Sequence, residues 1–123
     1  MPTIKIIDAR LTSEEVNVLL ISLPSLVVRE LSCQDFPLEL SDVSIDLVNL
    51  HPLGVMHNDA RIEIEASYCR ARLEIADNAA AAILDGLAAI LDERIPGKSG
   101  TPTTKDISVW IKLVEGGYAS RKV

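Results

Sequence analysis

The chain has 123 residues and a formal net charge of −6 at pH 7. This length fits one domain with a genuine hydrophobic core, so two domains are not expected. Apolar residues make up 48% of the sequence but aromatic residues only 3%, so the core must consist of Val, Ile, Leu and Ala, as in layered α/β proteins. The acidic balance argues against a nucleic-acid-binding surface, which needs a basic stripe. No apolar stretch is long enough to span a membrane.

The cysteines and the N-terminal residues bear on the cellular compartment. Cys33 and Cys69 have neither the spacing of a disulfide framework nor a C-x-x-C motif. This usage is typical of a reducing compartment, in which both thiols stay reduced. The first residues, MPTIKIID, lack the basic and then apolar order of a signal peptide. We therefore expect a cytoplasmic protein.

Four segments alternate between apolar and polar residues, which is the period of a half-buried strand. They are residues 2–8, 43–49, 60–68 and 106–114. In the first, Ile4 and Ile6 face one way while Thr3 and Lys5 face the other. The polar faces of the four strands carry Lys5, Ser44, Asp46, Glu63, Glu65, Ser108 and Lys112, with Trp110 as the bulky exception. Helices should therefore cover only the apolar face, and the polar face must meet solvent or line a wet channel between subunits.

Two helices are predicted between these strands. Thr12 and Glu15 have the spacing of a capping box that opens the first helix. Its apolar stripe consists of Val16, Leu19, Leu20, Leu23, Val27 and Leu31. Pro24 falls within the stripe and predicts a kink or a change of axis. The second helix should run from about residue 72 to residue 95, where a Pro-Gly pair ends it. Its stripe consists of Ile75, Ala79, Ile83, Leu87 and Ile90.

The order of elements is β-α-β followed by β-α-β. Residues 59–123 repeat the pattern of residues 1–50 at an offset of roughly sixty residues. Two folds share this order. In a ferredoxin-like domain the halves interleave into one antiparallel sheet, whereas in the alternative each half is a right-handed βαβ unit with parallel strands.

A proline at position two, a duplicated βαβ unit and the segment LVEGGYAS after the last strand together resemble the tautomerase superfamily, which includes macrophage migration inhibitory factor and 4-oxalocrotonate tautomerase. The segment IEIEASYCR is similar to a strand of its bacterial branch called DUF1904, and the matching residues are Glu63, Tyr68 and Arg70. The resemblance implies a four-stranded mixed sheet with two helices on one face. It also implies a homotrimer, which would cover the sheet edges.

The resemblance further implies that the Pro2 nitrogen is a general base or acid. It would move a proton between the carbon and the oxygen of a small keto or enol carboxylate, once removal of Met1 has left a free amine. The pKa of an α-amino group is about 8. Burial or a nearby cation, supplied by Lys5 or Arg70, would lower it, and a base with a pKa near the working pH transfers protons best.

The substrate carboxylate is expected to bind Arg70, aided by Arg72 or Arg10, through the planar guanidinium group. Tyr68 is expected to wall the same pocket. Shorter members of the superfamily carry a substrate-binding arginine within the second strand. The corresponding segment here, DVSIDLV, has none.

Other patterns point to no further chemistry. His51 and His57, with Asp59 nearby, supply too few ligands for a metal ion. The GKS at 97–99 is not a phosphate loop, because the required first glycine falls at Asp92 and the helix precedes the motif. We expect no metal and no cofactor. Two alternatives to a tautomerase stay open, namely a non-catalytic trimeric binding or interaction protein and a ferredoxin-like domain that binds a small ligand.

Overall fold

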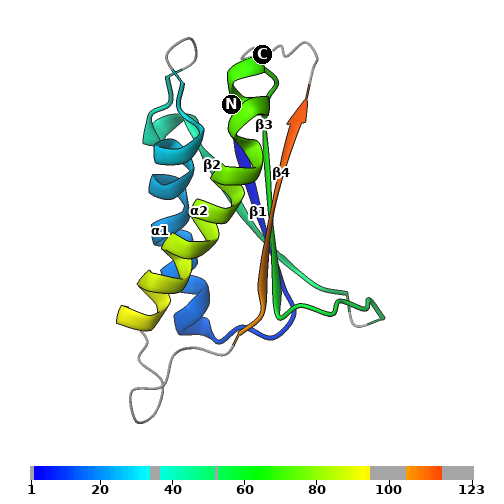
Figure 1. The fold of residues 1–123 in the computed structure, drawn as a ribbon. Coiled ribbons are helices and arrows are strands. Elements are labelled where there is room, and N and C mark those ends of the chain that lie inside the picture. The colour runs from blue at the N-terminus through cyan, green and yellow to red at the C-terminus, as the bar shows by residue number, and fades with distance from the viewer. Residues whose placement is uncertain (1, 34–36, 52, 95–104, 115–123) are drawn as a thin grey trace, which may run out of the picture.

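The fold has two layers, a sheet and a pair of helices (Figure 1). The computed structural model describes residues 2–33, 37–51, 53–94 and 105–114. Their elements are β1 (Thr3–Asp8), α1 (Ser13–Leu31), the short 3-10 helix η1 (Leu40–Asp42), β2 (Ser44–Asn49), β3 (Ala60–Ser67), α2 (Arg70–Arg94) and β4 (Ile107–Val114). The GKS segment and the glycine-bearing segment that follows β4 lie outside the described residues. All four predicted strands and both predicted helices are present.

The strands form one mixed sheet in the order β2-β1-β3-β4. Each half of the chain pairs its own two strands in parallel, with Ile4 opposite Ile45 in β1 and β2 and Ile62 opposite Val109 in β3 and β4. The two halves then join through antiparallel pairing of β1 with β3, which sets Ile4 opposite Ile64. The ferredoxin-like alternative is therefore wrong, because it requires the two halves to interleave in an antiparallel sheet.

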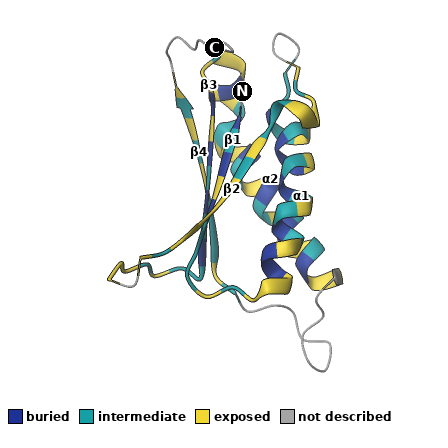
Figure 2. Cartoon of the chain, turned by 180° about the vertical axis from the view of Figure 1, so that it is seen from behind, coloured by how far each residue is buried: buried dark blue, intermediate teal, exposed yellow. Residues whose placement is uncertain are grey.

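Both helices cover the same face of the sheet, and the core lies between the layers (Figures 1 and 2). The buried residues come from alternate positions of β1 and β3 and from one side of each helix. They are Ile4, Ile6, Leu19, Leu23, Leu26, Val27, Leu31, Ile62, Ile64, Ala66, Ala79, Ile83, Leu87 and Leu91. This cluster contains no aromatic residue, as the composition predicted. The opposite face of the sheet has no helix over it in the described part of the chain.

The predicted capping box opens α1. The Glu15 amide donates to Thr12 Oγ1 at 3.2 Å, and the Thr12 amide donates to Glu15 Oε1 at 2.8 Å, so two of the otherwise unpaired amides at this end are satisfied. The helix continues as one element through Pro24. The change of axis expected at that residue stays a prediction.

Helix α2 begins at Arg70, two residues before the predicted start. Its buried stripe ends on Leu91, whereas Ile75 and Ile90 are only half-buried. Gly86 of α2 faces α1, because a Cβ there would lie 2.8 Å from Leu26 Cδ2. Glycine therefore lets α2 pack against Leu26 of α1 at this distance, whereas the Cβ of a larger residue would require Leu26 to shift.

The segment between β2 and β3 extends away from both layers (Figure 1). It exposes two large apolar side chains, since Leu53 is 87% exposed and Val55 is 86% exposed. In the chain as described, no helix combines the length and the apolar character needed to cross a lipid bilayer.

Candidate functional site

Pro2 stands directly before β1, one of the two inner strands of the sheet. Its carbonyl accepts a hydrogen bond from the Ser44 amide at 3.1 Å, which extends the pairing of β1 with β2 by one residue. The side chain is less than 2% exposed. Because Ile4 and Ile6 are buried on the helix-covered face and side chains alternate along a strand, the Pro2 ring lies on that face too.

The end of β3 and the start of α2 lie at the same end of the sheet as Pro2, because Thr3 pairs with Glu65. Tyr68 follows β3, and its amide donates to the carbonyl of Val114 at 2.9 Å. Its side chain is 40% exposed. The Arg70 side chain is 89% exposed and pairs with Glu74 through Nε and Oε1 at 3.5 Å. An exposed pair of this kind is weak, so the Arg70 guanidinium can exchange Glu74 for another carboxylate.

Arg72 lies at this end as well but is 2% exposed. Its Nε donates to the carbonyl of Leu31 at 3.1 Å, and its Nη1 donates to the carbonyl of Ser67 at 3.0 Å. The guanidinium therefore joins the last turn of α1 to the last residue of β3. These contacts give Arg72 a structural role at this junction, and its predicted contact with substrate stays a prediction.

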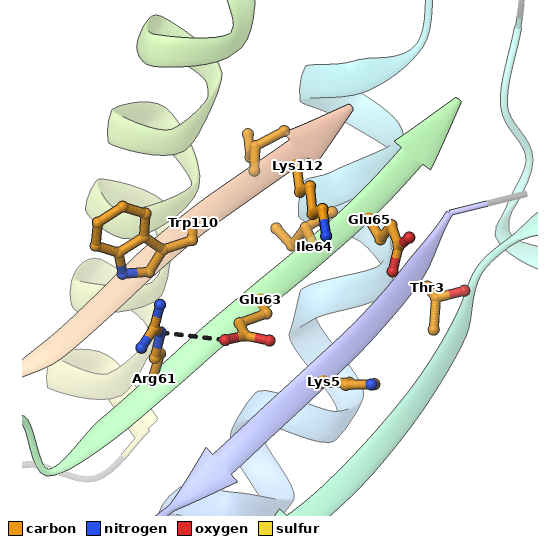
Figure 3. Close-up of a pocket in the computed structure, with 9 residues that line it drawn as sticks. Thr3, Lys5, Arg61, Glu63, Ile64, Glu65, Trp110 and Lys112 are labelled. Atoms are coloured by element: carbon orange, nitrogen blue, oxygen red, sulfur yellow. Dashed lines mark ion pairs between the residues drawn. The ribbon is translucent and has the colours of Figure 1, made fainter. Parts of the chain in front are cut away.

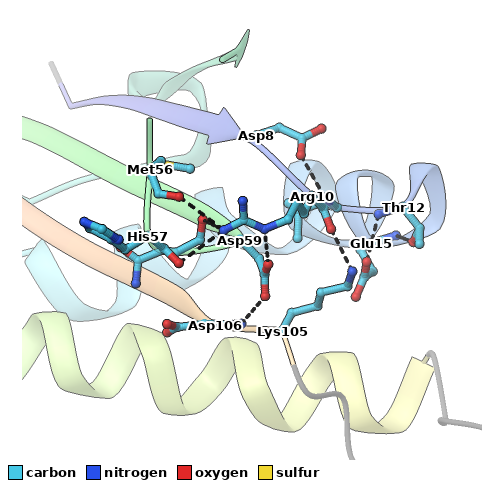
Figure 4. A network of polar contacts seen from close by, with 11 residues as sticks. Asp8, Arg10, Thr12, Glu15, Met56, His57, Asp59, Lys105 and Asp106 are labelled. Atoms are coloured by element: carbon cyan, nitrogen blue, oxygen red, sulfur yellow. Dashed lines mark hydrogen bonds and ion pairs between the residues drawn. The ribbon is translucent and has the colours of Figure 1, made fainter. Parts of the chain in front are cut away.

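Arg10 lies at the opposite end of the sheet, beyond β1, whose length is about 20 Å at 3.3 Å per residue. Its Nε donates to Asp59 Oδ1 at 2.7 Å, and its Nη2 donates to the carbonyls of Met56, His57 and Asn58 at 3.2, 3.1 and 2.7 Å. Figure 4 shows the guanidinium directed into the segment before β3. Within one chain the fold thus separates Arg10 from Pro2 and gives it an anchoring contact with this segment.

Asp59 is the centre of the contacts at that end. Its Oδ2 accepts from the Asp106 amide at 2.8 Å, and its Oδ1 accepts from Arg10. The hydrogen bond from Asp106, followed by the one from Arg10, holds the pKa of Asp59 below its ordinary value. Such a group stabilises the fold above the pKa of the unfolded chain, about 3.9, and that contribution is lost as the pH falls through the folded-state pKa.

Asp59→Asn is expected to make the free energy of unfolding less dependent on pH under acidic conditions. Asparagine keeps an acceptor oxygen but has no charge to protonate, so the free energy of unfolding will fall less steeply than in the wild type below about pH 4. Urea unfolding at a series of pH values measures this. Asp77→Asn, on the exposed side of α2, is the matched control and should keep the steep pH dependence of the wild type. Equal pH dependence in Asp59→Asn and the wild type would contradict the assignment.

The polar face of the sheet carries a hollow of about 510 Å³. Figure 3 shows the side chains that line it, which come from β1, β3 and β4 and include Thr3, Lys5, Arg61, Glu63, Glu65, Trp110 and Lys112. Pro2 is not among the lining residues. Lys5 lies on this face, as the alternation predicted, opposite Asp46 on one side and Glu63 on the other. Its expected effect on the pKa of the Pro2 amine stays a prediction.

Sequence reasoning missed the pairing of Arg61 with Trp110. The Arg61 guanidinium carbon lies 5.1 Å from the centre of the Trp110 ring, within the range of a cation–π contact. Arg61 Nε is also 3.2 Å from Glu63 Oε1, although the geometry is not that of a hydrogen bond. The alternation places all three residues on one face, but only the parallel register of β3 and β4 brings them together.

Charges on the polar face balance one another. The cations are Lys5, Arg61 and Lys112, and the anions are Asp46, Glu63 and Glu65. A carboxylate ligand gains little from a surface without net charge. By contrast, the guanidinium of Arg70, at the end of the sheet that carries Pro2, is exposed and only weakly paired. Among the described residues, no group of three His, Cys, Asp or Glu side chains is arranged to hold a metal ion.

Comparison with known proteins identifies the fold. No protein-family model matches the sequence, and no curated protein matches it. Several solved structures, however, match this chain. A macrophage migration inhibitory factor-like protein from Entamoeba histolytica is 13% identical, with 96% of this chain and 95% of that chain covered and a TM-score of 0.57. The chain has the tautomerase fold.

Two further structures with the tautomerase fold extend the comparison. FG41 malonate semialdehyde decarboxylase inhibited by 3-bromopropiolate is 16% identical, with 98% of this chain and 91% of that chain covered and a TM-score of 0.55. A fused 4-OT described as an asymmetric trimer is 17% identical, with 97% and 94% covered and a TM-score of 0.50. The predicted fold class, with two βαβ units and both helices on one face of a mixed sheet, is confirmed.

Proposed function

We propose that this protein is a tautomerase or isomerase that shifts a proton on a small keto or enol carboxylate, with Pro2 as the base. The position of Pro2 carries the proposal, because it heads an inner strand at the end of the sheet that also holds Tyr68 and Arg70. The burial of its ring disfavours the ammonium form of a nitrogen freed by removal of Met1. A neutral amine is the form that accepts a proton.

The residues around Pro2 take different roles in this proposal. Arg70 anchors the substrate carboxylate, because its guanidinium is exposed and only weakly paired. Tyr68 forms a wall of the pocket. Contacts of Lys5 or Arg10 with the same substrate would have to cross a subunit boundary, since each lies away from Pro2 in its own chain.

A homotrimer is part of the proposal. Within the described residues, β2 and β4 have no strand on their outer sides, and unpaired edges need cover. Leu47 and Val48 on β2 and Trp110 and Val114 on β4 are large apolar side chains left exposed in the single chain. The fused 4-OT with the same fold is a trimer. Three copies would bury these residues and enclose the polar face of each sheet.

Three further assignments go with this function. The chain is treated as one tautomerase-like domain made of two repeats, residues 1–50 and 59–123. The segment IEIEASYCR favours the DUF1904 branch of the superfamily. A cytoplasmic location fits Cys33 and Cys69, which no disulfide joins in the structure.

A non-catalytic trimeric binding or interaction protein is the second candidate. The observation that favours it is the burial of Pro2, which is less than 2% exposed. A catalytic base must reach its substrate, whereas a proline that merely starts a strand is tolerated when buried.

The intact mass of untagged protein distinguishes the two candidates. We expect loss of Met1, a free Pro2 amine whose titration is followed by ¹⁵N NMR, and catalysis of the enol–keto conversion of phenylenolpyruvate. Retention of Met1 would leave Pro2 as an amide without a basic nitrogen. A mass that still includes Met1 favours the binding protein. A free Pro2 amine without activity toward enol acids favours it as well.

A further inference from the structure

Two thiols lie in contact at the end of the sheet that carries Pro2. Cys33 follows α1, and Cys69 directly precedes α2, with the Cys69 carbonyl accepting from the Leu73 amide at 3.0 Å. The two Sγ atoms are 3.7 Å apart although the residues are 36 positions apart in the sequence. Both side chains are half-buried, so a small molecule can reach them. Their spacing in the sequence gave no sign of this proximity.

The two segments that carry the thiols are already held together by Arg72. Its guanidinium donates to the carbonyls of Leu31 and Ser67, and each cysteine lies two residues beyond one of these carbonyls. The buried contacts of Arg72 therefore keep the two segments, and with them the two sulfur atoms, close together. A preorganised pair reacts more readily than two mobile thiols, since little freedom is left to lose.

The geometry is close to that of a disulfide. A disulfide places its sulfur atoms about 2.05 Å apart, so Cys33 Sγ and Cys69 Sγ, now 3.7 Å apart, must approach by roughly 1.6 Å. The cross-link requires that rotation about the χ1 bonds, with small shifts of the two segments, supplies this movement.

We propose that Cys33 and Cys69 are a reversible modification site, a thiol pair that a peroxide oxidises to an intramolecular disulfide. One thiol ionises and its thiolate attacks an oxygen of hydrogen peroxide. The O–O bond breaks, which gives a sulfenic acid and a hydroxide that takes up the proton lost by the thiol and becomes water. The neighbouring thiol then attacks the sulfenic sulfur, an S–S bond forms, and a second water leaves. In total, two thiols and one hydrogen peroxide give one disulfide and two waters. A thiol reductant reverses the reaction by thiol–disulfide exchange.

Oxidation bears on the site as well as on the fold. Cys69 stands between Tyr68 and Arg70 in the chain, so the cross-link restrains both of the substrate contacts proposed above. This step rests on the proposed function. The modification itself does not, because it follows from the sulfur contact alone.

The test uses untagged wild-type protein treated with hydrogen peroxide, blocked with N-ethylmaleimide and weighed without reduction. The expected result is a loss of about 2 Da with no maleimide added, and full maleimide labelling after dithiothreitol. Trypsin should give a linked pair of peptides, residues 30–61 and 62–70, which carry Cys33 and Cys69. The oxidised protein should melt about 5–15 °C higher, because the cross-link restricts the unfolded chain.

Cys33→Ser and Cys69→Ser are the matched controls, and peroxide should raise the melting temperature of neither. The proposal is overturned if oxidised wild-type protein keeps two maleimide-reactive thiols, gains oxygen without a linked peptide pair, or forms disulfide-linked dimers. None of these readouts depends on catalysis. An inactive protein that still forms the cross-link would contradict the proposed function and leave this inference standing.

Discussion

Replacing Pro2 by alanine is expected to lower kcat for phenylenolpyruvate by about 10²–10⁴-fold, the usual contribution of a positioned general base. Alanine leaves a primary amine without the buried ring of proline, so both the basicity and the position of the nitrogen change. KM should change little, because the carboxylate is held by Arg70. Steady-state kinetics on protein of verified N-terminal mass gives both parameters.

A matched variant separates the chemistry of Pro2 from its packing. An N-terminal Gly-Ser extension that retains Met1 keeps the proline ring in place but makes its nitrogen an amide, which has no basic lone pair. The extended protein should be as inactive as Pro2→Ala while its melting temperature stays near that of the wild type. An extended protein that turns over phenylenolpyruvate at the wild-type rate would rule out Pro2 as the base.

Sequence patterns predicted the helices and strands well, because residues close together in the sequence determine each of these elements. The alternation of Ile4 and Ile6 reflects burial on one face of β1, and Thr12 with Glu15 satisfies the first amides of α1. The start of α2 was predicted two residues too late, because neither Tyr68 nor Cys69 is a usual capping residue that would mark it in the sequence. The choice between parallel and interleaved strands depended on contacts between distant segments, which alternation does not encode.

The candidate site was predicted less completely, because its contacts also join segments that are distant in the sequence. Arg72 is seven residues before Ala79 and so falls on the buried stripe of α2, but an arginine is usually read as exposed. Its acceptors, the carbonyls of Leu31 and Ser67, are backbone groups that no side-chain pattern reveals. Arg10 was expected to aid Arg70 at the substrate carboxylate, and that role stays a prediction. Within its own chain Arg10 lies beyond the far end of β1 and binds Asp59.

Arg72→Met is expected to lower the free energy of unfolding by about 2–4 kcal/mol, because it removes the donors to two carbonyls at a buried junction. A buried polar group left without its partner costs about 1–3 kcal/mol. Methionine fills much of the space of the aliphatic stem, so lost hydrogen bonds rather than a cavity should dominate. Urea unfolding measures the change.

Arg70→Met is the matched control, two residues away on the same turn but 89% exposed. It should change the free energy of unfolding by less than about 0.5 kcal/mol while raising KM for an acidic substrate about 10- to 100-fold, the loss expected for a hydrogen bond to a charged group. Arg72 would then support the fold, and Arg70 would bind the substrate carboxylate. A stable Arg72→Met protein with raised KM, beside an unchanged Arg70→Met, would reverse the assignment and make Arg72 the carboxylate anchor.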